Sequence, residues 1–263
     1  MLLAAGKGSR LRPLTNSWPK CLMPVHGVPI LEYWLDLIHS LGIQDVLVNL
    51  HHLAPEVEAF LLRPKFKDWV KYVYEKDLFG TAGTLRKNFK FFSGSTILLV
   101  HADNWCQCNF NDFINYHFYN RPKKCPITMM TFDSLNPKSC GIVNIDSDGI
   151  VKAFYEKEEN PPGRIANGAV YLLEPEVMDM LCEDNSISDF STHVIPKYIN
   201  RIATWHNNGI HRDIGTFDDL YEVQNHLSPS MLSNQNIIRF KDGWSEAFDK
   251  HQIHIEIKKR KLI

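Results

Sequence analysis

The sequence lacks several features that would place it in a broad class at once. Its longest apolar runs, such as Thr96–Val100, have the length of a strand and are too short to span a membrane. Its 29 basic residues nearly balance its 30 acidic residues, so no overall field attracts nucleic acid or an anionic membrane. The N-terminus has no charged region and cleavage site of a signal peptide. We therefore expect no nucleic-acid or membrane partner, and any anion site must be local.

Patterns for disulfides, zinc and covalent catalysis are also lacking. The six cysteines form no C-x-x-C pair and are too sparse for a disulfide scaffold, which predicts a reduced, cytoplasmic protein. No Ser-His-Asp or G-x-S-x-G arrangement supplies a nucleophile. Several histidines do not have a zinc spacing, and we expect them to be structural or to lie at a pocket edge. These are His51, His52, His101, His206 and His211.

The feature around which the chain is organised is a glycine loop near its start. Gly6 and Gly8 follow a short apolar run, and Arg10 and Lys20 come after them. Glycine lets backbone N–H groups approach a phosphate closely, and both cations lie within reach of the same anion. Leu11 stands where a dinucleotide fingerprint needs its third glycine, and no Walker lysine follows Gly8. The loop thus favours phosphate binding over a purely structural turn.

The first half alternates strands and helices with short links. Only Met1–Ala4 precede the glycine loop, so the first strand is short or the natural chain starts earlier. A helix follows Pro29 and stops at Gly42. The later apolar runs predict strands at 45–50, 70–74, 96–100 and 127–132, with helices at 54–62, 81–88 and 111–119 between them. This alternation indicates a right-handed, doubly wound parallel sheet.

The second half is mixed. The turn Asp146–Gly149 joins two apolar runs, at 141–145 and 150–155, into a hairpin. Further strands are expected at 169–173 and 202–206, with helices from Pro175 and over 190–199. Thr216 and Asp219 have the spacing of a capping box before a helix over 220–227. We expect one domain over 1–227, with a small antiparallel subregion on the substrate side.

Residues 228–263 form an extension of unknown role. Its first part, 228–236, is polar and loop-like, and 239–251 has no clean period. Ile253, Ile255 and Ile257 alternate with polar residues, which suggests an edge strand. The basic end, Lys258–Lys261, is interpreted as a solvated tail.

Ligands of open parallel sheets bind at the carboxyl ends of the strands, where three segments carry suitable residues. One is the glycine loop. The second is Gly80–Gly83, whose glycines allow close backbone approach with one hydroxyl from Thr81, although glycine can also simply open a helix. The third is Asp103, which follows a buried run and is either a cap or a metal ligand. With Asp213 it could hold one Mg²⁺ and leave sites for phosphate oxygens.

The same motifs resemble those of a known family. They are LAAGKGSRLRPLT…PKCLMPV near the start, GTAG at 80–83, HADN at 101–104, FYEK at 154–157, Asn167-Gly168, and DIGT at 213–216. In this order, over residues 1 to about 226, they resemble the sugar-1-phosphate nucleotidyltransferases. The resemblance implies an α/β, Rossmann-like (glycosyltransferase-A-like) fold with a mixed, mainly parallel sheet flanked by helices. It also implies a Mg²⁺-dependent reaction of an NTP with a sugar 1-phosphate, giving an NDP-sugar and pyrophosphate.

The resemblance also implies residue roles. Arg10, Lys20, Asp103 and Asp213 would be the catalytic set, with Asp103 and Asp213 holding the metal and Lys20 on the α-phosphate or the sugar phosphate. The triphosphate would lie on Gly6, Gly8 and Arg10, and the base near the backbone of Ala4 and Ala5. The nucleoside side would be lined by Gly80, Thr81 and Gly83. The sugar or its phosphate would contact Gly141, Glu156, Lys157 and Asn167.

The finer features of the resemblance concern specificity. The GTAG segment is similar to that of guanylyltransferases for mannose or manno-heptose 1-phosphate, which favours GTP and a role in lipopolysaccharide or capsule synthesis. Cys21 replaces a proline common in this motif, a change we expect the loop to tolerate. The extension does not resemble the left-handed β-helix of some relatives. Members of the family often form homo-oligomers.

Other functions remain open at this point. The chain could be a cytidylyltransferase for another small phosphorylated acceptor such as phosphocholine. It could also be a non-catalytic regulatory homologue that binds an NDP-sugar, although the intact catalytic set argues against this. A glycosyltransferase of the same fold is disfavoured, because Asp103 is followed by Asn104 and Trp105 and makes no D-x-D pair.

Overall fold

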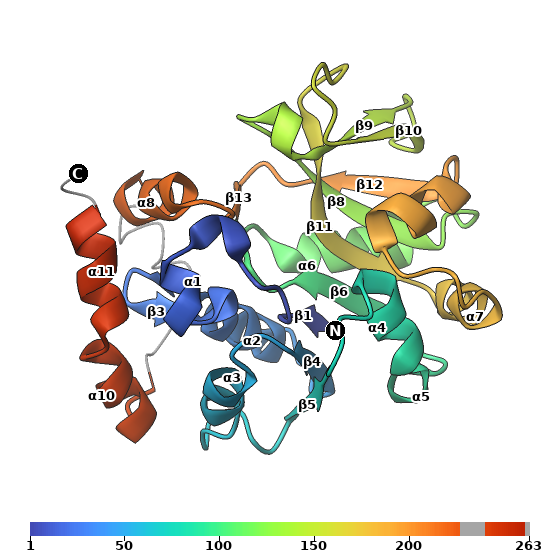
Figure 1. The fold of residues 1–263 in the computed structure, drawn as a ribbon. Helices are drawn as coiled ribbons and strands as arrows, with labels where there is room; N and C mark the ends of the chain where they lie inside the picture. The colour runs from blue at the N-terminus through green and yellow to red at the C-terminus, as the bar shows by residue number, and fades with distance from the viewer. Residues whose placement is uncertain (227–239, 261–263) are drawn as a thin grey trace. The chain divides into compact units, whose positions relative to one another are not determined.

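The computed structural model describes residues 1–226 and 240–260, which fall into two compact units (Figure 1). The terminal unit combines both ends of the chain, Leu2–Asp77 and the residues from Arg212 onward, with the short segment Ala102–Trp105. The middle unit holds Met1, Leu78–His101 and Cys106–His211. Strands β7 (Asn104–Gln107) and β13 (Ile210–Asp213) pair as a ribbon, and along each of them the chain passes from one unit to the other.

The terminal unit contains a parallel sheet. Strand β1 (Leu2–Leu3) pairs with β4 (Val46–Leu50), and β4 pairs in turn with β5 (Val70–Tyr74). Every residue of β4 is buried, Asn49 included, as expected for a central parallel strand. The carboxyl ends of the three strands lie together at one edge, and there the glycine loop leaves β1. Within this sequence, β1 has two residues.

Helices in the terminal unit bury apolar stripes. Helix α2 (Ile30–Ser40) buries Trp34, Leu35 and Ile38, and Gly42 follows its end with φ of 75°. That left-handed conformation suits glycine and ends the helix where the sequence predicted. The unit also contains α1, α3, α8, α10, α11 and the hairpin β2–β3. Their bounds are Leu14–Ser17, Ala54–Leu61, Phe217–His226, Gly243–Asp249, Gln252–Arg260, and Pro24–Val25 with Val28–Pro29.

The middle unit is built on the long strand β11 (Ile165–Leu173). It runs antiparallel between β6 (Ile97–His101) and β8 (Ile127–Asp133), and β12 (Ile202–His206) extends the sheet parallel to β8. The expected hairpin is present as β9 (Gly141–Ile145) and β10 (Val151–Glu156), and β9 meets β11 at Ala166. The wholly parallel order inferred from the first half does not extend into this unit, because β11 separates β6 from β8.

Helices of the middle unit occur close to the expected positions. They are α4 (Thr81–Lys87), α5 (Phe89–Phe92), α6 (Phe110–Asn115) with a π turn over Tyr116–Asn120, and α7 (Pro175–Glu183). The helical segment expected over 190–199 is a π turn, Phe190–Val194, followed by a 3-10 turn, Ile195–Tyr198. A further 3-10 turn spans Pro137–Ser139. The α/β class, with a mixed sheet, flanking helices and an antiparallel hairpin, is confirmed.

The C-terminal extension differs from its expectation. The segment with no clean period contains α10, and the expected edge strand is helix α11. Ile253 and Ile257 are buried while Ile255 is half exposed, which is the i, i+4 pattern of a helix. Lys258 and Lys259 are exposed, as a solvated basic end requires, while Lys261 and the loop-like segment 228–236 lie outside the described residues. No helix in the described part of the chain is both long and apolar enough to cross a membrane.

Candidate active site

The start of the glycine loop is tied to the carboxyl ends of the parallel strands. The N–H of Ala4, the first residue after β1, donates to Asn49 Oδ1 at 2.8 Å. Asn49 Nδ2 donates in turn to Glu75 Oε1 at 2.9 Å, and both side chains are buried. A buried carboxylate and amide that satisfy each other form a rigid base for the loop.

The fold constrains the two glycine positions of the loop differently. Gly8 has φ of 59°, and a Cβ there would come within 2.8 Å of Thr15 Cγ2. Thr15 Oγ1 also donates to the Gly8 carbonyl at 2.8 Å, so this bend is part of the fold. A Cβ on Gly6 would meet nothing within 4 Å. The fold therefore requires glycine at position 8, whereas at position 6 it leaves room above the backbone.

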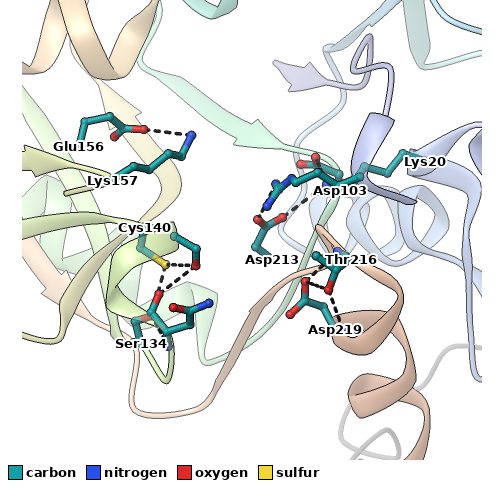
Figure 2. A network of polar contacts seen from close by, with 12 residues as sticks. Lys20, Asp103, Ser134, Cys140, Glu156, Lys157, Asp213, Thr216 and Asp219 are labelled. Carbon is teal, nitrogen blue, oxygen red and sulfur yellow. Dashed lines mark hydrogen bonds and ion pairs between the residues drawn. The ribbon is translucent and has the colours of Figure 1, made fainter. Parts of the chain in front are cut away.

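Lys20 lies in a 3-10 turn, Lys20–Leu22, directly after Pro19. Its side chain is only 8% exposed, and Nζ lies 2.5 Å from Asp103 Oδ2 and 3.4 Å from Asp213 Oδ1 (Figure 2). Asp103 is held next to β1, because the N–H of Ala102 donates to the Leu3 carbonyl. Cys21, the residue that replaces proline, is buried in the same turn, and burial raises the pKa of its thiol to about 12.

Arg10 adds a second cation to this cluster. Its Nη2 lies 3.3 Å from Asp213 Oδ2, and its side chain is 56% exposed. A Cβ on Gly215 would come within 2.8 Å of the guanidinium, so the backbone after Asp213 passes directly under Arg10. The four residues that the resemblance named as catalytic are thus brought together in the terminal unit.

The electrostatics of the cluster are balanced. Burial alone would lower the pKa of Lys20, but Asp103 and Asp213 outweigh burial and raise that pKa above its usual value. Lys20 is therefore an ammonium at neutral pH. Two carboxylates face two cations, so the charges of the four side chains cancel until another charged group binds.

The two carboxylates fit a magnesium ion. Within the described residues, no group of three or more His, Cys, Asp or Glu side chains is placed to hold a metal ion. A pair of aspartates is nevertheless the donor set that Mg²⁺ takes when substrate phosphates and water supply its other ligands. Both aspartates are partly exposed, so such oxygens can reach them.

The residues after Asp213 hold it in place. Ile214 is fully buried, and the capping box predicted before α8 is present. The N–H of Thr216 donates to Asp219 Oδ2 at 2.7 Å, and the N–H of Asp219 donates to Thr216 Oγ1 at 3.2 Å (Figure 2). Asp213 therefore lies between a strand and a capped helix, on rigid backbone.

Gly80–Gly83, the segment predicted to line the nucleoside, packs closely against other residues of the middle unit. Gly80 has φ of 77°, and a Cβ there would come within 2.4 Å of the Ser188 carbonyl. The amides of Ala82 and Gly83 both donate to that carbonyl. The N–H of Phe190 donates to Thr81 Oγ1. This contact explains GTAG as a helix start that packs on residues 188–190, and a contact with a nucleoside stays a prediction.

Three of the predicted sugar-side residues meet at the open end of the β9–β10 hairpin. Gly141 pairs with Glu156, and a Cβ on Gly141 would come within 2.7 Å of Glu156 Oε2. Lys157 has φ of 51°, and its N–H donates to the Cys140 carbonyl. Its Nζ lies 3.2 Å from Glu156 Oε1 (Figure 2). These residues form a small polar group of both charges within the middle unit.

The fourth sugar-side residue, Asn167, is held in a bulge of β11. Its Oδ1 accepts the N–H of Ala169, and its Nδ2 donates to the hydroxyl of Tyr171 at 2.6 Å. Ala169 has φ of 52° where the register of β11 on β8 shifts. Asn167 therefore has a structural role, and its remaining hydrogen-bonding capacity is what a ligand could use.

Several histidines are structural, as expected. A ring nitrogen that is hydrogen-bonded to a backbone carbonyl must carry the proton, so His51, His52 and His211 donate to the carbonyls of Glu75, Thr15 and Gly168.

Two residues that support the charged cluster and the glycine loop were not identified from the sequence. Asn49 could have been found because it is a polar residue inside an otherwise apolar strand. Gly215 could have been found because it is the glycine of the DIGT motif.

The chain is similar to a known family and to several known proteins. The family model described as Nucleotidyl transferase matches residues 1–230. A UTP–glucose-1-phosphate uridylyltransferase of Synechocystis sp. is 29% identical over 76% of this chain and 55% of its own length. A mannose-1-phosphate guanylyltransferase of Mycobacterium tuberculosis is 28% identical over 83% of this chain and 61% of its own length. The chain thus spans little more than half the length of these relatives.

A solved structure supports the fold. HddC from Yersinia pseudotuberculosis, crystallised in complex with GMP-PN, superposes with a TM-score of 0.72 at 20% sequence identity. The superposition covers 86% of this chain and 98% of HddC. The family match over residues 1–230 leads to one assignment. The chain belongs to the nucleotidyl transferase family.

Proposed function

We propose that the protein transfers a nucleoside monophosphate from an NTP, preferably GTP, to a sugar 1-phosphate of the mannose or manno-heptose type. The products are an NDP-sugar and pyrophosphate. The observation that carries this proposal is the cluster of Arg10, Lys20, Asp103 and Asp213 beside the glycine loop.

The cluster suits a reaction between two anions. An oxygen of the sugar phosphate attacks the α-phosphorus in line with the departing pyrophosphate, and a protein nucleophile is not required. Arg10 is exposed and can turn toward the triphosphate, whereas buried Lys20 offers its ammonium from a fixed position. Both cations lower the repulsion between the reactants and neutralise charge on the leaving group.

Asp103 and Asp213 would hold Mg²⁺, which would supply further positive charge to the phosphate oxygens. These two carboxylates are the partners of Lys20 and Arg10 in the structure. Binding of a metal ion by the carboxylates would leave both cations to pair with phosphates. The four residues thus keep the site neutral before binding and complement the substrates afterwards.

Relatives support the donor and acceptor. Guanylyl transfer to mannose 1-phosphate is named for the protein of Mycobacterium tuberculosis, and HddC was crystallised with GMP-PN. The GTAG segment resembles that of guanylyltransferases. Glu156 and Lys157 offer an acceptor and a donor, which suits a sugar ring with its phosphate. The named uridylyltransferase relative makes UTP the main competing donor.

A matrix of pyrophosphate-release assays tests the proposal. Each of GTP, UTP, CTP, ATP and dTTP is combined with mannose, manno-heptose and glucose 1-phosphates, and with phosphocholine, in the presence of Mg²⁺. We expect release to be fastest with GTP and a mannose-type acceptor, and to stop with EDTA. If pyrophosphate were released fastest with UTP or CTP, that nucleotide and not GTP would be the donor. Nucleotide binding without release in any combination would favour a regulatory protein and contradict the enzymatic proposal.

A further inference from the structure

The C-terminal extension contacts the segment that carries Lys20. The family match ends at residue 230, so α10 and α11 lie beyond it. Both helices belong to the terminal unit, and α11 packs beside α1, the helix that follows the glycine loop (Figure 1). The two helices thus adjoin α1 and Trp18, although both lie outside the family match.

An aromatic stack forms this contact. Trp18 follows α1 and stacks on Phe248 of α10, with ring centroids 5.6 Å apart and planes 19° apart. The ring centroid of His251, between α10 and α11, lies 4.2 Å from that of Trp18 with the planes tilted by 37°, and Trp244 stacks on Phe248 at 5.0 Å. Trp18 and Phe248 are both buried. Aromatic pairs in such offset arrangements stabilise the packing by more than the burial of their surface area alone would.

Trp18 passes this restraint to the Lys20 turn. Its indole Nε1–H donates to the Leu22 carbonyl at 2.8 Å, which bridges the whole Lys20–Leu22 turn. The turn is closed on itself by the bonds from Leu22 N to Pro19 O and from Met23 N to Lys20 O. One face of Trp18 therefore rests on the extension while its polar edge holds the turn from which Lys20 projects.

A second, polar contact fixes α10 in place. Asp242 caps α10 and also accepts from Arg63 Nε at 2.7 Å. Arg63 is 2% exposed, donates to Glu32 of α2 at 2.8 Å, and has its guanidinium 4.9 Å from the ring of Trp244. The helix that supplies Phe248 is thus tied to the terminal unit independently of Trp18.

We propose that the extension is a positioning device for the reaction: Phe248 and His251 hold Trp18, and Trp18 holds the turn that presents Lys20. This inference rests on the proposed function in that it takes Lys20 to be the lysine that meets the phosphates. In this proposal Trp18 and Phe248 are positioning residues, because they act on Lys20 through the turn that carries it.

Two conservative variants test the proposal from opposite sides of the stack. Phe248→Leu keeps an apolar side chain but removes the ring, and Trp18→Phe keeps a ring but removes the N–H bonded to Leu22. Ile255→Ala is the matched control, because Ile255 lies on α11 with its side chain 52% exposed. All three are full-length proteins, compared at a temperature where circular dichroism shows each to be folded.

Amide hydrogen exchange over residues 14–23 and steady-state kinetics are the two readouts. We expect both stack variants to exchange faster over 14–23 and at the parental rate in β4. We expect kcat to fall about tenfold in each, with a smaller change in KM, because Lys20 is displaced from the reacting phosphates. Ile255→Ala should match the parent in both readouts.

The outcomes separate this inference from the proposed function. Unchanged exchange over 14–23 in both variants overturns the positioning role, and so does faster exchange with unchanged kcat. A fall in kcat that only follows lost thermal stability, without local exchange, also overturns it. If the parent protein releases no pyrophosphate, the proposed function has failed. The exchange measurement then still decides whether the stack holds the turn.

Discussion

Arg10 and Lys20 meet the same aspartate but differ in burial, and this difference predicts different roles. Lys20 is buried and has two carboxylate partners, whereas Arg10 is half exposed and has one. An exposed ion pair contributes little to stability because water and salt screen it. Arg10 is therefore free to serve a ligand at almost no cost to the fold.

The first prediction follows from this exposure. Arg10→Ala should lower kcat about 100-fold by removing a group that neutralises the leaving pyrophosphate. The melting temperature should remain close to that of the parent. Pyrophosphate release and thermal unfolding measure the two effects, with exposed Arg12→Ala as the control. Normal turnover in Arg10→Ala would show that the loop does not bind the triphosphate through this residue.

The aspartates give a second prediction at the residue scale. Asp213→Asn and Asp103→Asn should each reduce turnover about 100-fold or more, because each removes a metal-binding charge and a partner of Lys20. Asp219→Asn is the matched control, since Asp219 caps α8 and does not touch the cluster. It should cost about 1 kcal/mol of stability and leave turnover near normal. Parental turnover in either of the first two variants would remove that aspartate from the metal site.

At the scale of elements, a buried polar network joins three parts of the middle unit. His117, in the π turn after α6, is hydrogen-bonded to Thr128 of β8 and to Glu174, which precedes α7. Burial lowers the pKa of His117, and the bond to Glu174 only partly offsets this. The folded protein therefore disfavours the protonated imidazole more than the unfolded chain does.

The third prediction is a pH dependence with a defined sign. Below the ordinary histidine pKa of 6.5, the unfolded chain binds a proton that the folded His117 resists. The free energy of unfolding should thus decrease as the pH falls below 6.5. Urea unfolding of His117→Gln should show a flatter pH dependence of the free energy of unfolding than that of the parent. An equal slope in parent and His117→Gln would contradict the assignment.

At the scale of the whole molecule, the extension is joined to residues some 180 positions earlier in the chain. Arg63 lies between Glu32 of α2 and Asp242, and its guanidinium lies over the rings of Phe60, Phe66 and Trp244. A buried charge that loses its partner is costly because no water replaces it. The ends of the chain therefore fold as one unit.

The fourth prediction concerns this tie. Arg63→Met should cost about 3–5 kcal/mol in urea unfolding, since it leaves the buried carboxylate of Glu32 with only Lys65. The exposed pair between Arg201 and Glu176 is the control, and Arg201→Met should cost about 1 kcal/mol or less. A combined Glu32→Gln, Arg63→Met variant should recover part of the loss. Equal costs for the two single variants would show that burial does not decide the effect.

Much of the fold followed from local signals. The strands at 46–50 and 97–101, the helix ended by Gly42 and the capping box of Thr216 and Asp219 depend on neighbouring residues, and each was predicted. The extension was not, because Ile253, Ile255 and Ile257 satisfy a period of two as well as an i, i+4 spacing. Which period applies depends on the surface that buries Ile253 and Ile257, and this surface comes from distant segments.

The sequence by itself determined which residue types stand at the ends of the strands, and so the family and the members of the candidate site. Only the tertiary structure decided that Lys20 meets Asp103 and Asp213, which are 83 and 193 residues away. It alone decided that Trp18 rests on the extension. The physical reason is that turns, caps and periodicity act over a few residues, whereas ion pairs and stacked rings require the packing of segments that no local pattern relates.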